Sequence, residues 1–73
     1  MDVLKINMDE TVKLLGERIK TLRKRKHWTQ DELAHYLEVA PSSVGSYERG
    51  TRQPTIENLI RMSKYFNVSL DYL

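Results

Sequence analysis

Residues 29–50 read TQDELAHYLEVAPSSVGSYERG, and this stretch decides the fold. Its first four residues form a capping box: the Thr29 hydroxyl can accept a hydrogen bond from the Glu32 amide, and the Glu32 carboxylate can reach back to the Thr29 amide. A helix therefore starts at Thr29 and extends to about Leu37, because the apolar residues after the box fall on one face. These residues are Leu33, Ala34 and Leu37.

A second helix follows closely, and its signal is Pro41. Proline fits the first turn of a helix, where its missing N–H removes no hydrogen bond and its fixed backbone angle is already helical. We expect this helix to start near Ala40 or Pro41 and to run to about Arg49, since Gly50 stops it. Only about three residues, 38–40, then join the two helices, which predicts a tight turn between them.

Before this stretch, apolar residues recur at steps of three and four, which predicts a first helix with one apolar face. It should run from about Asp9 or Val12 to Lys26. Its apolar positions are Val12, Leu15, Ile19 and Leu22. Basic residues crowd toward its end, where cations suit the helix dipole; they are Arg18, Lys20, Arg23, Lys24, Arg25 and Lys26. Such a basic patch attracts phosphates, although a helix end that merely faces water has the same sequence.

After this stretch, Pro54 gives a turn and Thr55 an N-cap, so a fourth helix is expected to end at Asn67, a residue that tolerates the left-handed cap conformation. Its inner face is predicted to consist of Ile56, Leu59, Ile60 and Phe66. Ser69 can cap a final short helix at residues 70–73. The sequence thus predicts an all-α fold, a compact bundle of five short helices.

Length and composition limit the chain to one globular domain. Its 73 residues are 40% hydrophobic and 30% charged, with a net charge of +2, which is typical of a small folded domain. We divide it into an N-terminal extension, residues 1–11, and a folded domain, residues 12–73. With no cysteine, the stability must come from core packing. No apolar run approaches the roughly 20 residues that cross a membrane, and the first ten residues do not resemble a secretory signal, so we expect a cytoplasmic protein without a membrane partner.

Four segments carry a family pattern: GERIKTLR at residues 16–23, TQDELA at 29–34, SSVGSYERGTRQP at 42–54 and TIENLIRMSKYFNVSLDYL at 55–73. In this order and spacing they resemble the lambda-repressor-like helix-turn-helix family, which includes Cro, the phage repressors and xenobiotic-response-element proteins. The resemblance implies that the second and third helices form the helix-turn-helix. The third helix would lie in the major groove of DNA, while the second crosses the backbone.

The resemblance also implies roles for individual residues. The base-reading candidates are Pro41, Ser42 and Ser46, with Gly45 on the same exposed side, and Ser43, which can instead turn toward the phosphates or the helix start. The phosphate candidates are Gln30, at the start of the second helix, and the residues that end and follow the third helix, Arg49, Thr51, Arg52 and Gln53. Val44 and Tyr47 would be the inward face of the third helix.

Arg23 and Glu48 resemble the internal ion pair of the family, which ties the first helix to the end of the third. Exposed pairs contribute little to stability, so we expect this pair mainly to orient the helices. Trp28 and Tyr47 are large enough to dominate a small core, and we interpret both as packing residues rather than as stacking platforms for single strands.

The chain also departs from the family pattern. His27 and Glu38 stand where the family usually has glycine, at the ends of the first and second helices. If these positions are left-handed, each costs on the order of 1 kcal/mol relative to glycine. Long polar side chains are absent from the front of the third helix, and serine makes single hydrogen bonds where arginine or glutamine makes two. Specificity is then modest or depends on water and DNA shape.

The resemblance implies a transcriptional regulator that binds double-stranded DNA and joins the nucleoid when bound, with a repressor on a palindromic operator as the leading hypothesis. A domain of this size buries little DNA surface, so we expect a homodimer with a contact around residues 70–73. A further C-terminal domain or a partner protein stays open. So do two alternatives: an antitoxin or restriction-modification controller that represses its own operon, and an interaction module that holds a protein while the basic patch is incidental.

The sequence does not predict an enzyme, since it contains no nucleophile turn, glycine-rich phosphate loop or paired-carboxylate site. His27 and His35 lie eight residues apart without a cysteine to complete a site, so we expect neither a metal nor another cofactor.

Overall fold

The computed structural model describes residues 8–73. The elements in order are α1 (Met8–Arg25), α2 (Gln30–Leu37), α3 (Pro41–Arg49), α4 (Ile56–Phe66) and the 3-10 turn η1 (Leu70–Tyr72). These residues contain no strand, which confirms the all-α class. The fifth helix is shorter than expected, a single 3-10 turn whose Tyr72 amide donates to the Ser69 hydroxyl. Of the expected N-terminal extension, residues 1–7 lie outside the described part, and residues 8–11 belong to α1.

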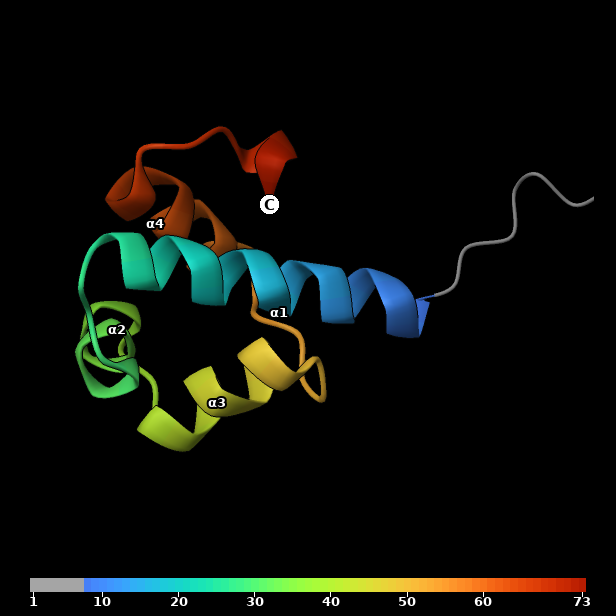
Figure 1. Cartoon of the computed structure of the whole chain (residues 1–73), viewed down its shortest axis with the longest axis horizontal. Coiled ribbons are helices and arrows are strands. Elements are labelled where there is room, and N and C mark those ends of the chain that lie inside the picture. The colour runs from blue at the N-terminus through green and yellow to red at the C-terminus, as the bar shows by residue number, and fades with distance from the viewer. Residues whose placement is uncertain (1–7) are drawn as a thin grey trace, which may run out of the picture.

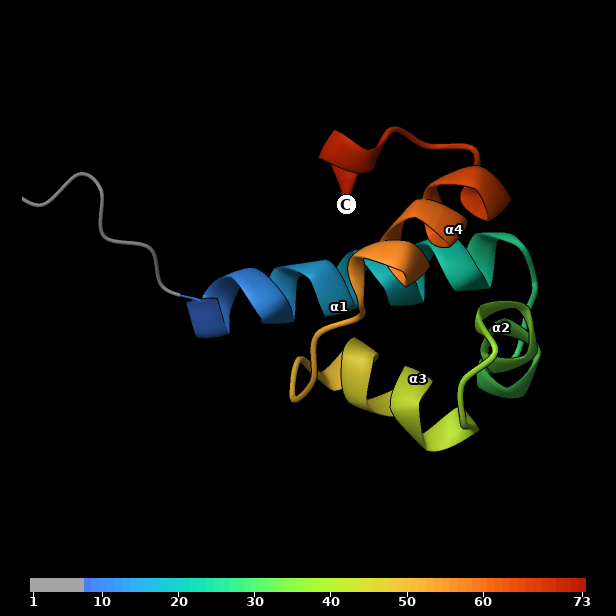
Figure 2. The same cartoon turned by 180° about the vertical axis from the view of Figure 1, so that it is seen from behind.

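The long helix α1 runs through the middle of the fold. In two opposite views, α2 and α3 lie on one side of it, and the end of α4 and η1 lie on the other (Figures 1 and 2). The turn between α2 and α3 leaves them packed against each other, and α3 also packs along α1. None of the helices described is long and apolar enough to span a membrane.

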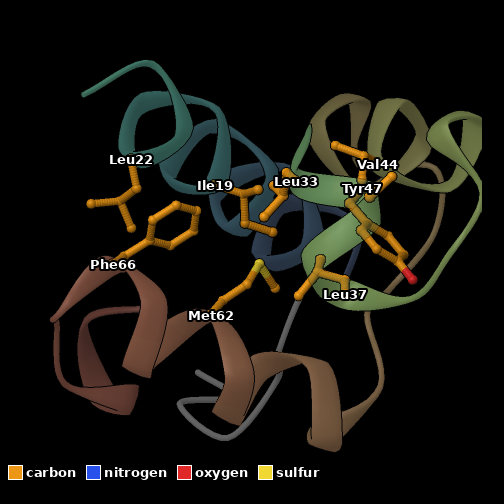
Figure 3. Packing of buried hydrophobic residues seen from close by; sticks show 9 residues of the cluster. Ile19, Leu22, Leu33, Leu37, Val44, Tyr47, Met62 and Phe66 are labelled. Atoms are coloured by element: carbon orange, nitrogen blue, oxygen red, sulfur yellow. The ribbon is translucent and has the colours of Figure 1, made fainter. Parts of the chain in front are cut away.

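One hydrophobic cluster joins all four α-helices. Ile19 of α1, Leu33 of α2, Val44 of α3 and Met62 of α4 are fully buried, and Figure 3 shows these side chains pointing toward one another. Leu22, Ala34, Leu37, Tyr47 and Phe66 complete the cluster. The inward positions expected for Val44 and Tyr47 are therefore confirmed. Because these side chains leave water together, their packing fixes α3 relative to α1 and α2.

The inner face of α4 differs from the prediction. Ile56 is 72% exposed and Ile60 41% exposed, so both were wrongly assigned to the core. The buried residues are Asn58, Met62 and Phe66, which recur at steps of four. Apolar residues occupy two adjacent faces of this helix, and contact with the rest of the core selects the face that carries Met62. Asn58 can be buried because its carbonyl oxygen accepts a hydrogen bond from Arg61.

All four α-helices end in the same way. Each is followed by a left-handed residue, and the amide of the next residue donates to the carbonyl five positions back, as in the Schellman motif. The left-handed residues are His27, Glu38, Gly50 and Asn67. His27 and Glu38, which stand where the family usually has glycine, are thus left-handed, with φ of 59° and 58°. After three of these caps comes an apolar residue that packs on the core, namely Trp28, Val39 and Val68, which offsets the backbone cost.

Gly16 marks the closest approach between α1 and α3. A Cβ atom built on Gly16 would lie 2.3 Å from the Tyr47 carbonyl oxygen and 2.7 Å from the Glu48 carbonyl oxygen. Both atoms belong to the backbone, so neither can move without moving α3. The missing side chain at Gly16 therefore sets the depth at which α3 sits against α1.

Candidate nucleic-acid interface

Pro41 and Ser42, in the first turn of α3, lie outside the core. Ala40 precedes the helix in an extended conformation, and Pro41 occupies its first turn as predicted. Pro41 and Ser42 are exposed and Ser46 is half-buried, so the three principal base-reading candidates have surface outside the core. All three side chains are short, which allows the helix backbone to come close to a partner.

Ser43 turns inward. Its side chain is buried, and its hydroxyl accepts a hydrogen bond from Nη1 of Arg52 at 3.3 Å. Ser43 therefore does not share the exposed surface of Pro41 and Ser42. Through this contact α3 holds the loop that follows it, in which Thr51, Arg52 and Gln53 are all exposed.

Gly45 is not exposed, contrary to the prediction. It lies on the same side of α3 as Ser42, but the side chains of Arg49 and Gln30 cover it. A Cβ built on Gly45 would lie 3.0 Å from Arg49 Nη1 and 3.7 Å from Gln30 Oε1. The cover consists of the ends of two flexible side chains rather than of the core.

Arg23 and Glu48 form the internal ion pair that the family resemblance implies, and both side chains are buried. Arg23 donates from Nε to Glu48 Oε2 at 2.6 Å and from Nη2 to Oε1 at 3.1 Å. Its Nη1 donates to the Trp28 carbonyl at 2.7 Å. Only 10% of the Arg23 side chain and 4% of the Glu48 side chain are exposed. The two-pronged geometry supports the orienting role, and because the pair is buried, loss of either partner would leave an unpaired charge in the interior.

Gln30 joins this pair to the interface. Its Nε2 donates to Glu48 Oε1 at 3.1 Å, so α1, α2 and α3 meet at one carboxylate. The side chain of Gln30 is nevertheless exposed at the start of α2. Sequence reasoning missed this contact, because it depends on Glu48 being buried between helices that are far apart in the chain.

The six basic residues of the predicted patch divide into two groups. Arg23 is buried in its ion pair, and Arg18 lies over the Tyr72 ring at 5.2 Å and donates to the Tyr72 carbonyl, so both serve the fold. The others are exposed: Lys20, Lys24, Arg25 and Lys26. Two of the six positions are thus removed from the predicted patch.

Trp28 packs, as expected. Its ring stacks on Tyr36 with a centroid distance of 4.5 Å and lies 5.7 Å from the ring of Phe66.

A surface cavity of about 550 Å³ opens nearby between α2 and α4, where Tyr36 and Arg61 contribute to its wall. None of the predicted DNA contacts lines it. In residues 8–73 no group of three or more potential metal ligands is assembled, and neither His27 nor His35 belongs to one.

A family model described as helix-turn-helix, HTH_3, matches residues 19–73. The HTH-type transcriptional regulator ImmR of Bacillus subtilis is 39% identical over 59 residues, which are 81% of this chain and 46% of ImmR. The chain spans about half the length of the curated relatives it matches.

Two solved structures are similar to this fold. One is the biofilm regulator SinR in complex with DNA, which is 38% identical with a TM-score of 0.69, over 78% of this chain and 92% of SinR. The other is the restriction-modification controller protein C.AhdI from Aeromonas hydrophila, at 26% identity and a TM-score of 0.76, over 85% of this chain and 94% of C.AhdI.

Proposed function

Because the chain belongs to the helix-turn-helix family HTH_3, we propose that it is a sequence-specific transcriptional regulator, a repressor that binds a palindromic operator as a dimer. Each protomer would insert the first turn of α3 into the major groove of one half-site. The observation that carries the proposal is the outward position of Pro41 and Ser42 on a helix whose opposite side is anchored in the core. As such a regulator it would act in the cytoplasm, associated with the nucleoid while bound.

The contacts around Glu48 support this orientation. A recognition helix needs a fixed angle to the preceding helix, because base contacts depend on geometry within a fraction of an ångström. The carboxylate of Glu48 binds Arg23 of α1 and Gln30 of α2. The same Gln30 amide has a second N–H, which can donate to a phosphate when α2 crosses the backbone.

The loop after α3 is the proposed phosphate anchor. Thr51, Arg52 and Gln53 are exposed there, and Arg52 makes no ion pair with any described residue. Among the described residues, Ser43 is the one that hydrogen-bonds its guanidinium, so the group is available for a phosphate oxygen. Such a contact sets the register of the protein on the duplex without reading sequence.

The dimer contact is proposed at η1. Leu70 is 47% and Tyr72 39% exposed, which leaves apolar surface at the end of the domain. Arg18 holds this turn against α1 through the Tyr72 carbonyl, so its direction is fixed relative to α3. A further C-terminal domain, or a partner protein, would add contacts that stabilise the dimer.

Selection of bound sites from random duplex DNA tests the proposal, with the stoichiometry of the complex measured on the selected site. We expect a palindromic consensus with half-sites about 34–36 Å apart and two chains for each duplex. Affinity should fall steeply with ionic strength, because phosphate contacts release counterions. Absence of any enriched sequence, together with affinity that salt does not change, would contradict DNA binding and favour a protein-interaction module.

A restriction-modification controller is the second candidate function, supported by the similarity in fold to C.AhdI. Such a controller would bind its own promoter region. Footprinting on the DNA upstream of the coding sequence separates the two candidates, since protection there is expected for the controller and protection only at other operators for a general repressor.

A further inference from the structure

Arg49 occupies an unexpected position at the end of α3. Its side chain folds back over the preceding turn, so that a Cβ built on Gly45 would lie 3.0 Å from Arg49 Nη1 and 3.8 Å from Arg49 Cζ. Its Nη2 also donates to the Ser46 hydroxyl at 3.4 Å. The guanidinium thus rests on the surface formed by Gly45 and Ser46, and not along the loop that follows the helix.

This surface is the one that faces DNA in the proposed function. Ser42, Gly45, Ser46 and Arg49 are spaced by three and four residues, so they share one face of α3. Serine and glycine side chains are too short to reach deep into a groove by themselves. Arg49 is the long member of this face, and its guanidinium lies next to the small residues Gly45 and Ser46.

The guanidinium of Arg49 is also free to change partners. Arg49 forms no ion pair with any residue that the structure describes. Its bond to Ser46 is long, and therefore weak. Its planar fork of N–H donors matches the two acceptors, O6 and N7, that guanine presents in the major groove.

We propose that Arg49 is a base-reading residue that donates two hydrogen bonds to a guanine, and that Gly45 positions it by leaving the space beneath its guanidinium open. This role rests on the proposed function, because it requires α3 in the major groove. It replaces the phosphate contact that the family resemblance implies for Arg49. It also gives the interface the long polar reader that the front of α3 lacks.

The test compares operators that differ at single guanines of the selected site. For the wild-type chain, one guanine in each half-site should matter most, and replacing it should weaken binding about 5- to 150-fold. A 7-deazaguanine at the same place, which lacks the N7 acceptor, should reproduce part of this loss. With Arg49→Ala, the original, replaced and deaza operators should all bind alike at that position. Arg52→Ala is the matched control, since it removes the same charge and should weaken all three operators evenly while keeping the preference.

Gly45→Ala separates the position of the guanidinium from its charge. The added methyl fills the space under Arg49, so the same guanine preference should fall several-fold while the salt dependence of binding stays as in the wild type. Thermal unfolding of each variant verifies that the domain is folded.

The proposal is overturned if Arg49→Ala weakens every sequence evenly and lowers the salt slope by about one, the signature of a phosphate contact. It is equally overturned if Arg49→Ala keeps the full guanine preference. Failure of the wild-type chain to enrich any duplex would instead overturn the proposed function itself.

Discussion

The carboxylate of Glu48 is bound by Arg23 at two points, 2.6 and 3.1 Å, and 4% of its side chain is exposed. Arg23→Ala would leave this charge buried without its partner. We expect the free energy of unfolding to fall by about 3–5 kcal/mol, as measured by urea denaturation. Glu57→Ala is the control, because Glu57 pairs with Arg61 at an exposed site and should change stability by about 1 kcal/mol at most. Equal losses in the two variants would show that the buried pair is no stronger than a surface pair.

Gly16→Ala should destabilise the domain by about 1–3 kcal/mol, because the new Cβ overlaps the carbonyl oxygens at the end of α3. Gly45→Ala is the matched comparison within a helix. Its Cβ meets only the ends of Arg49 and Gln30, and alanine is the better helix former by about 1 kcal/mol. The two substitutions should therefore change the free energy of unfolding in opposite directions, or at the least by amounts that differ by more than about 1 kcal/mol. Thermal unfolding of both variants measures this difference. Identical melting curves would contradict close packing at Gly16.

His27→Gly should raise the free energy of unfolding by roughly 1 kcal/mol. His27 has a φ of 59° and an exposed side chain, so glycine removes strain at little cost in contacts. Gly50→Ala should act in the opposite sense, since Gly50 has a φ of 76° and an added Cβ would lie 2.8 Å from the Lys13 Cα. Chemical denaturation of both variants checks the pair, and a loss of stability in His27→Gly would mean that the histidine ring makes a compensating interaction.

Local sequence signals predict where most helices of this fold begin and end. Thr29 and Glu32 do form both hydrogen bonds of the capping box, and Pro41 and Gly50 bound α3 as expected. These signals act over four or five residues, so they can be read without knowledge of the tertiary structure.

The predictions of burial were wrong where contacts between distant parts of the chain determine which side chains are buried. Ile56 and Ile60 are as apolar as core residues, and only the contacts of Met62 with the other helices determine which face of α4 is buried. The burial of Glu48 likewise depends on Arg23, which lies 25 positions earlier. Gly45 is covered through the conformation of the Arg49 side chain, and no pattern in the sequence specifies that conformation.

Substitution of two adjacent serines of α3 tests which of its residues contact bases. Ser42 is exposed on the first turn and Ser43 is buried against Arg52, so the same substitution should have different effects. Ser42→Ala should change the selected base preference about 2- to 10-fold at one position of each half-site, the value of a single hydrogen bond. Ser43→Ala should lower affinity evenly for all sequences, because it releases Arg52 without touching a base. Site selection with each variant measures both effects. A consensus that shifts with Ser43→Ala and stays unchanged with Ser42→Ala would mean that α3 enters the groove on a different face.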